Sequence, residues 1–67
     1  MYQSIGLLEV KGLIPSIEAT DAMVKSASVS YMGCKTNGET ILIVIAGEYS
    51  AVCASLEIGL RQGQSFD

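Results

Sequence analysis

The sequence predicts an α+β fold in which five elements follow one another in the order β-α-β-β-α. Three observations predict it. Residues 4–10 alternate between apolar and other side chains with the period of a strand. Residues 15–27 and 48–60 carry apolar residues at helical spacing. Between these two stretches, an Asn-Gly dipeptide separates two further strand-like segments at 29–34 and 40–46, which is typical of a β-hairpin.

The first predicted strand runs from Ser4 to Val10, and its side chains alternate between two faces because strand side chains have a period of two. We expect Gly6, Leu8 and Val10 on one face and Ile5, Leu7 and Glu9 on the other. The Lys11-Gly12 pair ends this strand.

The first predicted helix begins at Pro15, since a proline in the first helical position loses no hydrogen bond. Lys25 falls near its C-terminal end, where the helix dipole favours a cation. The apolar residues at near-helical spacing are expected to form the buried stripe, which Thr20 interrupts. They are Leu13, Ile17, Val24 and Ala27.

The third predicted strand, Thr40 to Ala46, is β-branched at most positions and apolar on both faces. This pattern indicates an interior strand with cover on both faces or neighbours at both edges. Gly47 ends it, and a second helix follows from Glu48 to about Leu60. Its expected core stripe is Val52, Leu56 and Leu60, and Gly59 should weaken its end by up to about 1 kcal/mol relative to Ala.

This order matches the first five elements of a ferredoxin-like (split βαβ) unit, in which the third strand lies in the middle of the sheet. The sixth element of that unit, a last strand beside the first, is missing from the sequence. We interpret residues 4–61 as a single domain and residues 62–67 as a frayed tail.

Composition favours association with other copies of the chain. The 67 residues are 49% apolar and only 16% charged, and a domain of this size buries only about 60% of the surface of its unfolded chain. A net charge of −3 with four Lys/Arg argues against nucleic acid. The chain has no His and no paired cysteines of the C-x-x-C type, so a metal site is not expected. With no signal peptide and no apolar stretch long enough for a membrane, the sequence predicts a cytoplasmic protein.

Three blocks of the sequence resemble the shell proteins of bacterial microcompartments, which share the BMC domain. They are IGLLEVKGL (residues 5–13), IEATDAMVKSA (residues 17–27) and VIAGEYSAV (residues 44–52). The resemblance extends over about Ser4 to Gly59, which is most of the chain.

The resemblance implies a structural role. Such domains form hexamers, or pseudohexameric rings, that tile with other shell proteins into sheets around enzymes, and small metabolites pass through a pore on the ring axis. It implies a pore loop at Lys35, Thr36, Asn37, Gly38 and Glu39. A ring of Glu39 carboxylates would disfavour anions. It also implies that Lys25 lies at the edge between hexamers, where many members have an additional arginine near the C-terminus; the last arginine here, Arg61, lies in the second helix instead.

Simpler interpretations exist for several of these residues. The Asn37-Gly38 pair also suits an ordinary hairpin turn, and Lys25 an ordinary solvated helix end. Some trimeric shell proteins hold an iron–sulfur cluster at the pore through one cysteine per subunit or domain, and Cys34 precedes the turn; otherwise it is a small buried apolar residue. Cys53 is expected to pack in the second helix, although a disulfide between the two stays open.

No catalytic residues are expected. The carboxylates Glu9, Glu18 and Asp21 are accompanied by no nucleophile and no histidine, so an enzyme is the least favoured interpretation. A ferredoxin-like oligomeric ligand-binding regulatory module, for example one that senses an amino acid, is the alternative function from another class.

Overall fold

The computed structural model of the protein describes residues 3–64 and confirms the predicted order of elements. They are β1 (Ser4–Lys11), α1 (Leu13–Ser26), β2 (Val29–Asn37), β3 (Thr40–Gly47) and α2 (Tyr49–Gln64). Helix α1 begins at Leu13, two residues before Pro15, so the proline is the third helical residue rather than the first. A proline at that position still costs no intrahelical hydrogen bond. Helix α2 includes residues 62–64, which the sequence placed in a frayed tail; residues 65–67 of that tail lie outside the described residues.

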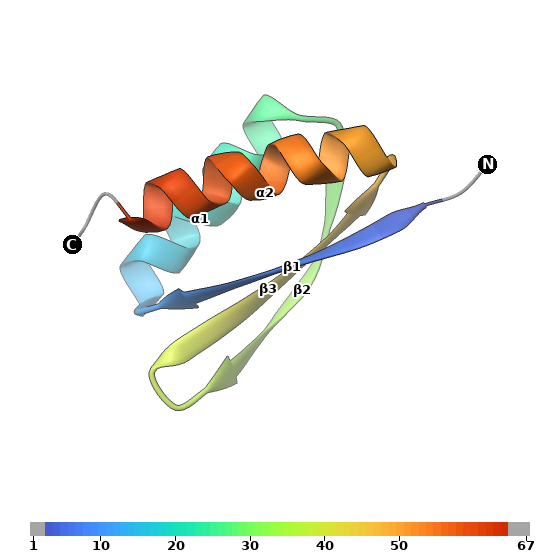
Figure 1. The fold of residues 1–67 in the computed structure, drawn as a ribbon. Coiled ribbons are helices and arrows are strands. Elements are labelled where there is room, and N and C mark those ends of the chain that lie inside the picture. The colour runs from blue at the N-terminus through green and yellow to red at the C-terminus, as the bar shows by residue number, and fades with distance from the viewer. Residues whose placement is uncertain (1–2, 65–67) are drawn as a thin grey trace.

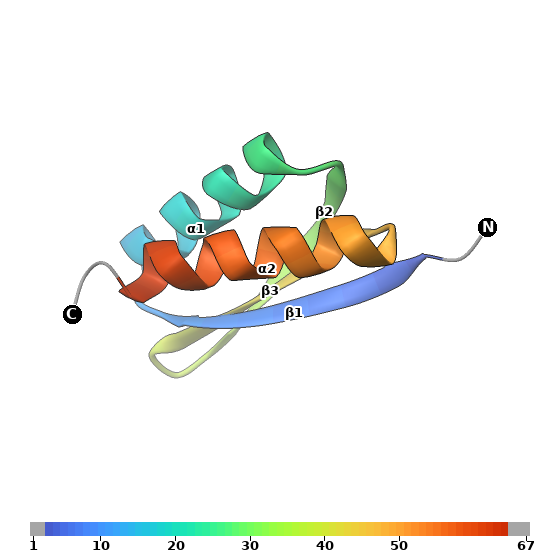
Figure 2. The same ribbon diagram turned by 45° about the horizontal axis from the view of Figure 1, so that its top comes forward.

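The three strands form one antiparallel sheet in the order β1-β3-β2. Both helices cover the same face of this sheet, so the domain has two layers (Figures 1 and 2). The predicted central place of the third strand is confirmed, and its apolar character on both faces coincides with neighbours at both edges and helices on one face only. Among residues 3–64, β1 has no strand on its other side.

Side chains of β1 alternate as predicted. Gly6, Leu8 and Val10 are buried toward the helices, whereas Ile5 and Leu7 are exposed on the opposite face. In β3 the residues that face the helices are buried; they are Ile41, Ile43 and Ile45. The sheet thus contributes one half of a single core.

The predicted stripe of α1 is wrong at three of its four residues; the fourth, Ala27, is half-buried and lies just after the helix. Leu13 and Ile17 are 64% and 57% exposed and Val24 is also exposed, while the buried residues of α1 are Ser16, Ala19 and Met23. Two of these three have small side chains, which let the helix approach its neighbours closely. The large apolar residues are therefore left on the outside of α1.

Helix α2 packs on β1 through two glycines, one in each element. A Cβ at Gly59 would stand 2.7 Å from Leu8 Cδ2 and 2.7 Å from Met23 Sδ, and a Cβ at Gly6 would stand 2.7 Å from Val52 Cγ1. Gly59 thus lies where the helix touches both the sheet and α1, and the missing side chain makes that contact possible.

The predicted stripe of α2 is confirmed at Val52, partly at the half-buried Leu56, and is wrong at the exposed Leu60. Its place is taken by Ser55, which is fully buried. The Ser55 hydroxyl donates a hydrogen bond of 3.2 Å to the carbonyl oxygen of Met23, so this buried polar group is satisfied.

Candidate functional site

The predicted pore loop is the tip of the β2–β3 hairpin, and it is shorter than expected. Strand β2 does not end at Cys34 but continues to Asn37, which pairs with Thr40. Lys35 and Thr36 are therefore strand residues, and Gly38 and Glu39 alone form the turn. Gly38 has a φ of +66° and Glu39 does not have a positive φ, the combination of a two-residue type II′ turn with Gly first.

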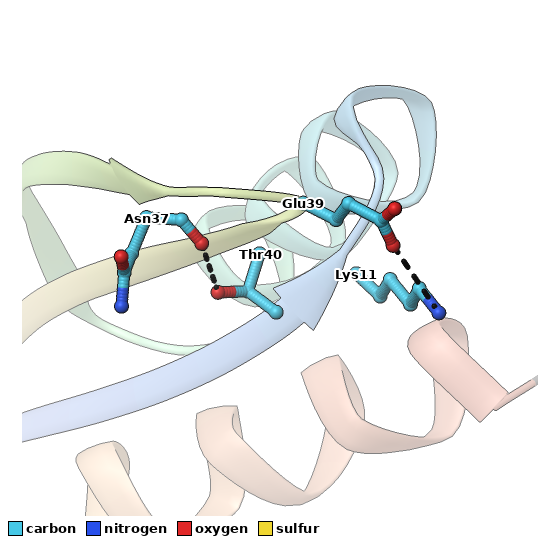
Figure 3. Close-up of polar contacts among 4 residues, drawn as sticks. All are labelled: Lys11, Asn37, Glu39 and Thr40. Atoms are coloured by element: carbon cyan, nitrogen blue, oxygen red, sulfur yellow. Dashed lines mark hydrogen bonds and ion pairs between the residues drawn. The ribbon is translucent and has the colours of Figure 1, made fainter.

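The turn is fixed by contacts on both sides (Figure 3). The Thr40 hydroxyl donates to the carbonyl oxygen of Asn37 at 2.9 Å, which closes the hairpin. The backbone N–H of Gly12 donates to the carbonyl oxygen of Glu39 at 2.9 Å. Lys11 Nζ lies 3.3 Å from Glu39 Oε1 (Figure 3). The tip is thus held against the junction between β1 and α1.

The electrostatics of the tip differ from those of a bare carboxylate. The side chains of Lys11 and Glu39 are 77% and 79% exposed, so their ion pair contributes little to stability. It nevertheless places a positive charge beside the Glu39 carboxylate. The tip therefore presents a balanced pair of charges, together with the exposed side chain of Asn37.

Lys25 lies in the last turn of α1, exposed, with its Nζ 3.1 Å from Asp21 Oδ2. Helix α1 begins beside the hairpin tip, because Gly12 precedes it, and its 14 residues span about 20 Å. The predicted edge residue and the predicted pore residues therefore lie beside opposite ends of α1, whose course Figure 1 shows.

The cysteines are both free and exposed, so the expectation that each packs in the interior is wrong. Cys34 lies on β2 facing a groove beside α1, four residues before Gly38 and so about 13 Å along the strand from the turn. A hydrogen bond with Cys34, with smaller contributions from burial and the thiolate charge, raises the pKa of Tyr31 above its usual value of 10.0. Cys53 raises the pKa of Tyr49 in the same way, again chiefly through a hydrogen bond.

The groove between α1 and β2 has a volume of ≈ 360 Å³ and an apolar lining. Leu13 and Ile17 border it from the helix and Tyr31 and Cys34 from the strand. The helical spacing of Leu13 and Ile17 predicted that they belong to the core, so these exposed apolar residues were not expected on the surface. Nothing in the spacing alone distinguishes a buried stripe from one that another molecule covers.

Residues 3–64 hold no group of three or more His, Cys, Asp or Glu side chains that could bind a metal ion. Within the same residues, neither helix has the length and apolarity that crossing a membrane requires.

The known proteins that resemble this chain in sequence or in structure are proteins of microcompartments or carboxysomes. The sequence pattern of the BMC domain matches residues 4–66. The bacterial microcompartment shell protein PduK of Citrobacter freundii is 42% identical over 62 residues, which cover 90% of this chain and 40% of PduK. PduA, a shell protein of Salmonella typhimurium, is 40% identical over 58 residues, covering 85% of this chain and 62% of PduA.

The major carboxysome shell protein CsoS1A of Halothiobacillus neapolitanus is 39% identical over 57 residues, covering 84% of this chain and 58% of CsoS1A. The crystal structure of a microcompartment protein from Desulfitobacterium hafniense superposes with a TM-score of 0.87 at 34% identity, covering 94% of this chain and 36% of that one. The chain thus spans between 40% and 62% of the length of these curated relatives.

Proposed function

Because the chain belongs to the BMC domain family, we propose that it is a structural subunit of a bacterial microcompartment shell. The observation that carries the proposal is the match of the BMC pattern to residues 4–66, together with relatives at about 40% identity that are named as shell proteins. In this proposal the protein is not an enzyme, and its location is the shell of a cytoplasmic microcompartment.

The subunits form a closed ring of six. A cyclic ring joins subunits head to tail, so each subunit needs two different complementary surfaces. One candidate is the α1–β2 edge, where Leu13, Ile17 and Tyr31 are exposed around the groove. Association would bury these apolar side chains, which the core of the single domain leaves exposed to water.

The second candidate surface is the flank of α2 on the other side of the domain. Ser55 contacts Met23 in α1 and Val52 contacts Gly6 in β1, which fixes the orientation of α2. At 3.6 residues per turn, Tyr49, Cys53 and Leu60 then fall on the flank away from α1, and all three are exposed. The two apolar surfaces therefore lie on opposite sides of the domain, as head-to-tail contact requires.

The ring places the hairpin tips at its axis and Lys25 at its perimeter. Support comes from their separation along the length of α1, since a pore residue and an edge residue of one subunit must lie far apart. At the perimeter, the Lys25 stem packs against the neighbouring ring and its ammonium meets backbone oxygen atoms. Other shell proteins are the partners across this seam.

The pore transmits small metabolites past the turns at Gly38 and Glu39. Six copies of the Lys11–Glu39 ion pair would surround it with alternating charges rather than with carboxylates alone. We therefore expect weaker discrimination against anions than an unpaired ring of Glu39 would give. The proposal involves no cofactor; an iron–sulfur cluster at Cys34 stays a prediction, and the residue's distance from the turn does not favour it.

Native mass spectrometry of the purified chain tests the ring. The proposal predicts a discrete species of six subunits, and Lys25→Ala should leave that species intact while abolishing lateral sheets in electron micrographs. Asp21→Ala is the matched control, because it removes the ion-pair partner of Lys25 but keeps the edge cation. A stable monomer or dimer that binds an amino acid would instead support the regulatory module of ferredoxin-like fold.

A further inference from the structure

The sheet face opposite the helices, here called the open face, is covered by no other element of residues 3–64 (Figure 2). Side chains of directly paired residues point to the same face, so the register arranges the open face in rows across β1, β3 and β2. The rows are Ile5–Ala46–Ser30, Leu7–Val44–Gly33, Glu9–Leu42–Lys35 and, beside the turn, Lys11–Thr40–Asn37, in which Lys11 is already paired with Glu39. Ile5 and Leu7 are 67% and 58% exposed, and Leu42 and Val44 are half-buried.

Two opposite charges border this apolar face. Glu9 on β1 and Lys35 on β2 both pair with Leu42 and lie on either side of it, about 10 Å apart because each strand spacing is about 4.8 Å. Both residues line the same shallow hollow with Leu42, so they share one face. Neither forms an ion pair with another residue in the described part of the chain; Glu9 Oε2 lies 3.4 Å from the Thr40 hydroxyl, whose one hydrogen is directed to the nearer Asn37 carbonyl.

We propose that the open face binds the open face of a second copy of this chain through a two-fold axis parallel to β3. Such a rotation exchanges the places of β1 and β2 in the facing sheet. Glu9 of one copy then lies opposite Lys35 of the other, and the reverse pair forms at the same time. The face thus carries the complement of its own charges, which selects a second copy over an unrelated partner.

Shape supports the same axis. Leu7 of one copy comes to lie opposite Gly33 of the other, and at Gly33 a Cβ would have no neighbouring atom within 4 Å, so there is room for the leucine. Leu42 and Val44 lie on the axis and meet their own counterparts. Two sheets that pack face to face in this way keep their strands within about 30° of each other, which the long Glu and Lys side chains can accommodate.

A two-fold axis across the strands is the other way to join two open faces. Centred on Val44, it would place Glu9 against Ile5 and Lys35 against Ser30 of the second copy. Both charges would then lose water without gaining a partner, which is unfavourable. The positions of Glu9 and Lys35 therefore favour the axis along β3.

This contact is independent of the ring proposed above, because it uses neither the α1–β2 groove nor the flank of α2. It doubles whatever species the chain forms: single chains would pair, and rings would stack in pairs through their sheets. A doubling of mass at rising concentration is consequently its signature, whether or not rings form.

Sedimentation equilibrium of Glu9→Lys, Lys35→Glu and the double variant tests the proposal. Each single substitution brings like charges together at two places and should raise the dissociation constant for doubling by at least about tenfold. The double variant exchanges the charges and should return to within about threefold of the unchanged chain. Glu18→Lys, an equal charge change on an exposed position of α1, should leave doubling unaffected.

Both substituted side chains are exposed, and circular dichroism verifies that each variant keeps the fold. Leu7→Ser provides a second route, because it removes the side chain opposite Gly33 without changing charge, and it should also weaken doubling. The proposal is overturned if the unchanged chain never doubles, if the single variants double as it does, or if the double variant is as weak as either single one. The last result would mean that the face contacts a different surface.

Discussion

Replacing Gly59 by alanine has two opposite effects on the free energy of unfolding, one from helix propensity and one from packing. Helix propensity alone predicts that Gly59→Ala stabilises α2 by about 1 kcal/mol. The structure predicts the reverse, because the new Cβ would stand 2.7 Å from Leu8 Cδ2, 2.7 Å from Met23 Sδ and 2.9 Å from Met23 Cγ. Met23 is fully buried, and overpacking of this kind typically costs about 1 to 3 kcal/mol.

We therefore expect Gly59→Ala to lower the free energy of unfolding by about 1 kcal/mol net, which corresponds to a melting temperature lower by about 4 to 8 °C for a domain of this size. Urea unfolding followed by circular dichroism measures it, at one fixed protein concentration because association would shift the midpoint. Ala54→Gly is the matched control: Ala54 is exposed on the same helix, so its loss should cost about 1 kcal/mol through propensity alone. If Gly59→Ala proves stabilising by the amount that propensity gives, the close approach of α2 to β1 and α1 is refuted.

Three further predictions concern other contacts. Ser55→Ala should lower the free energy of unfolding by about 1 to 2 kcal/mol, measured by the same urea unfolding, because it leaves the Met23 carbonyl without its 3.2 Å donor; no change would mean the bond is not made. The raised pKa of Tyr31 favours its neutral form in the folded chain, so its contribution to stability is complete below pH 10.0 and is lost as the pH rises through the raised value. Cys34→Ala should lower the titration midpoint of Tyr31, measured by ultraviolet absorbance. An unchanged midpoint would exclude the contact between Tyr31 and Cys34. Lys11→Ala should leave Glu39 unpaired and make conductance through assembled rings more cation-selective. Lys35→Ala is the comparison, because it removes a cation from the strand and leaves the Lys11–Glu39 pair intact. Equal selectivity in the two variants would place Glu39 away from the pore.

The features that the sequence predicted are those that depend on local period. The alternation of β1 identified Gly6, Leu8 and Val10 as its buried side, and the apolar run at residues 40–46 identified the central strand. Both patterns arise because a strand turns alternate side chains to opposite faces and an interior strand meets apolar neighbours.

The features that the sequence missed depend on how elements approach one another. In α1 the contact face carries Ser16 and Ala19, because small side chains allow close packing, and the larger Leu13 and Ile17 remain outside. Gly59 looked like a weakness of the helix and is instead its point of contact. The Lys11–Glu39 pair joins residues far apart in sequence, so only the sheet register brings them together.

The hairpin tip shows both outcomes at once. The Asn-Gly dipeptide correctly predicted a tight turn, but the turn is centred one residue later, on Gly38 and Glu39. The polar residues Lys35 to Asn37 continue β2 because β3 supplies paired partners for them as far as Thr40. Local sequence therefore located the hairpin turn, whereas the length of the loop and its contact with Lys11 follow from strand pairing.

Negative-stain electron microscopy of the purified protein tests whether this chain is a tile of a microcompartment shell. We expect flat sheets whose lattice has six-fold symmetry, with one ring in each unit cell, and we expect these sheets to be lost in Lys25→Ala. Particles that remain dispersed as single chains or pairs at every concentration, with no lattice in any field, would contradict this expectation.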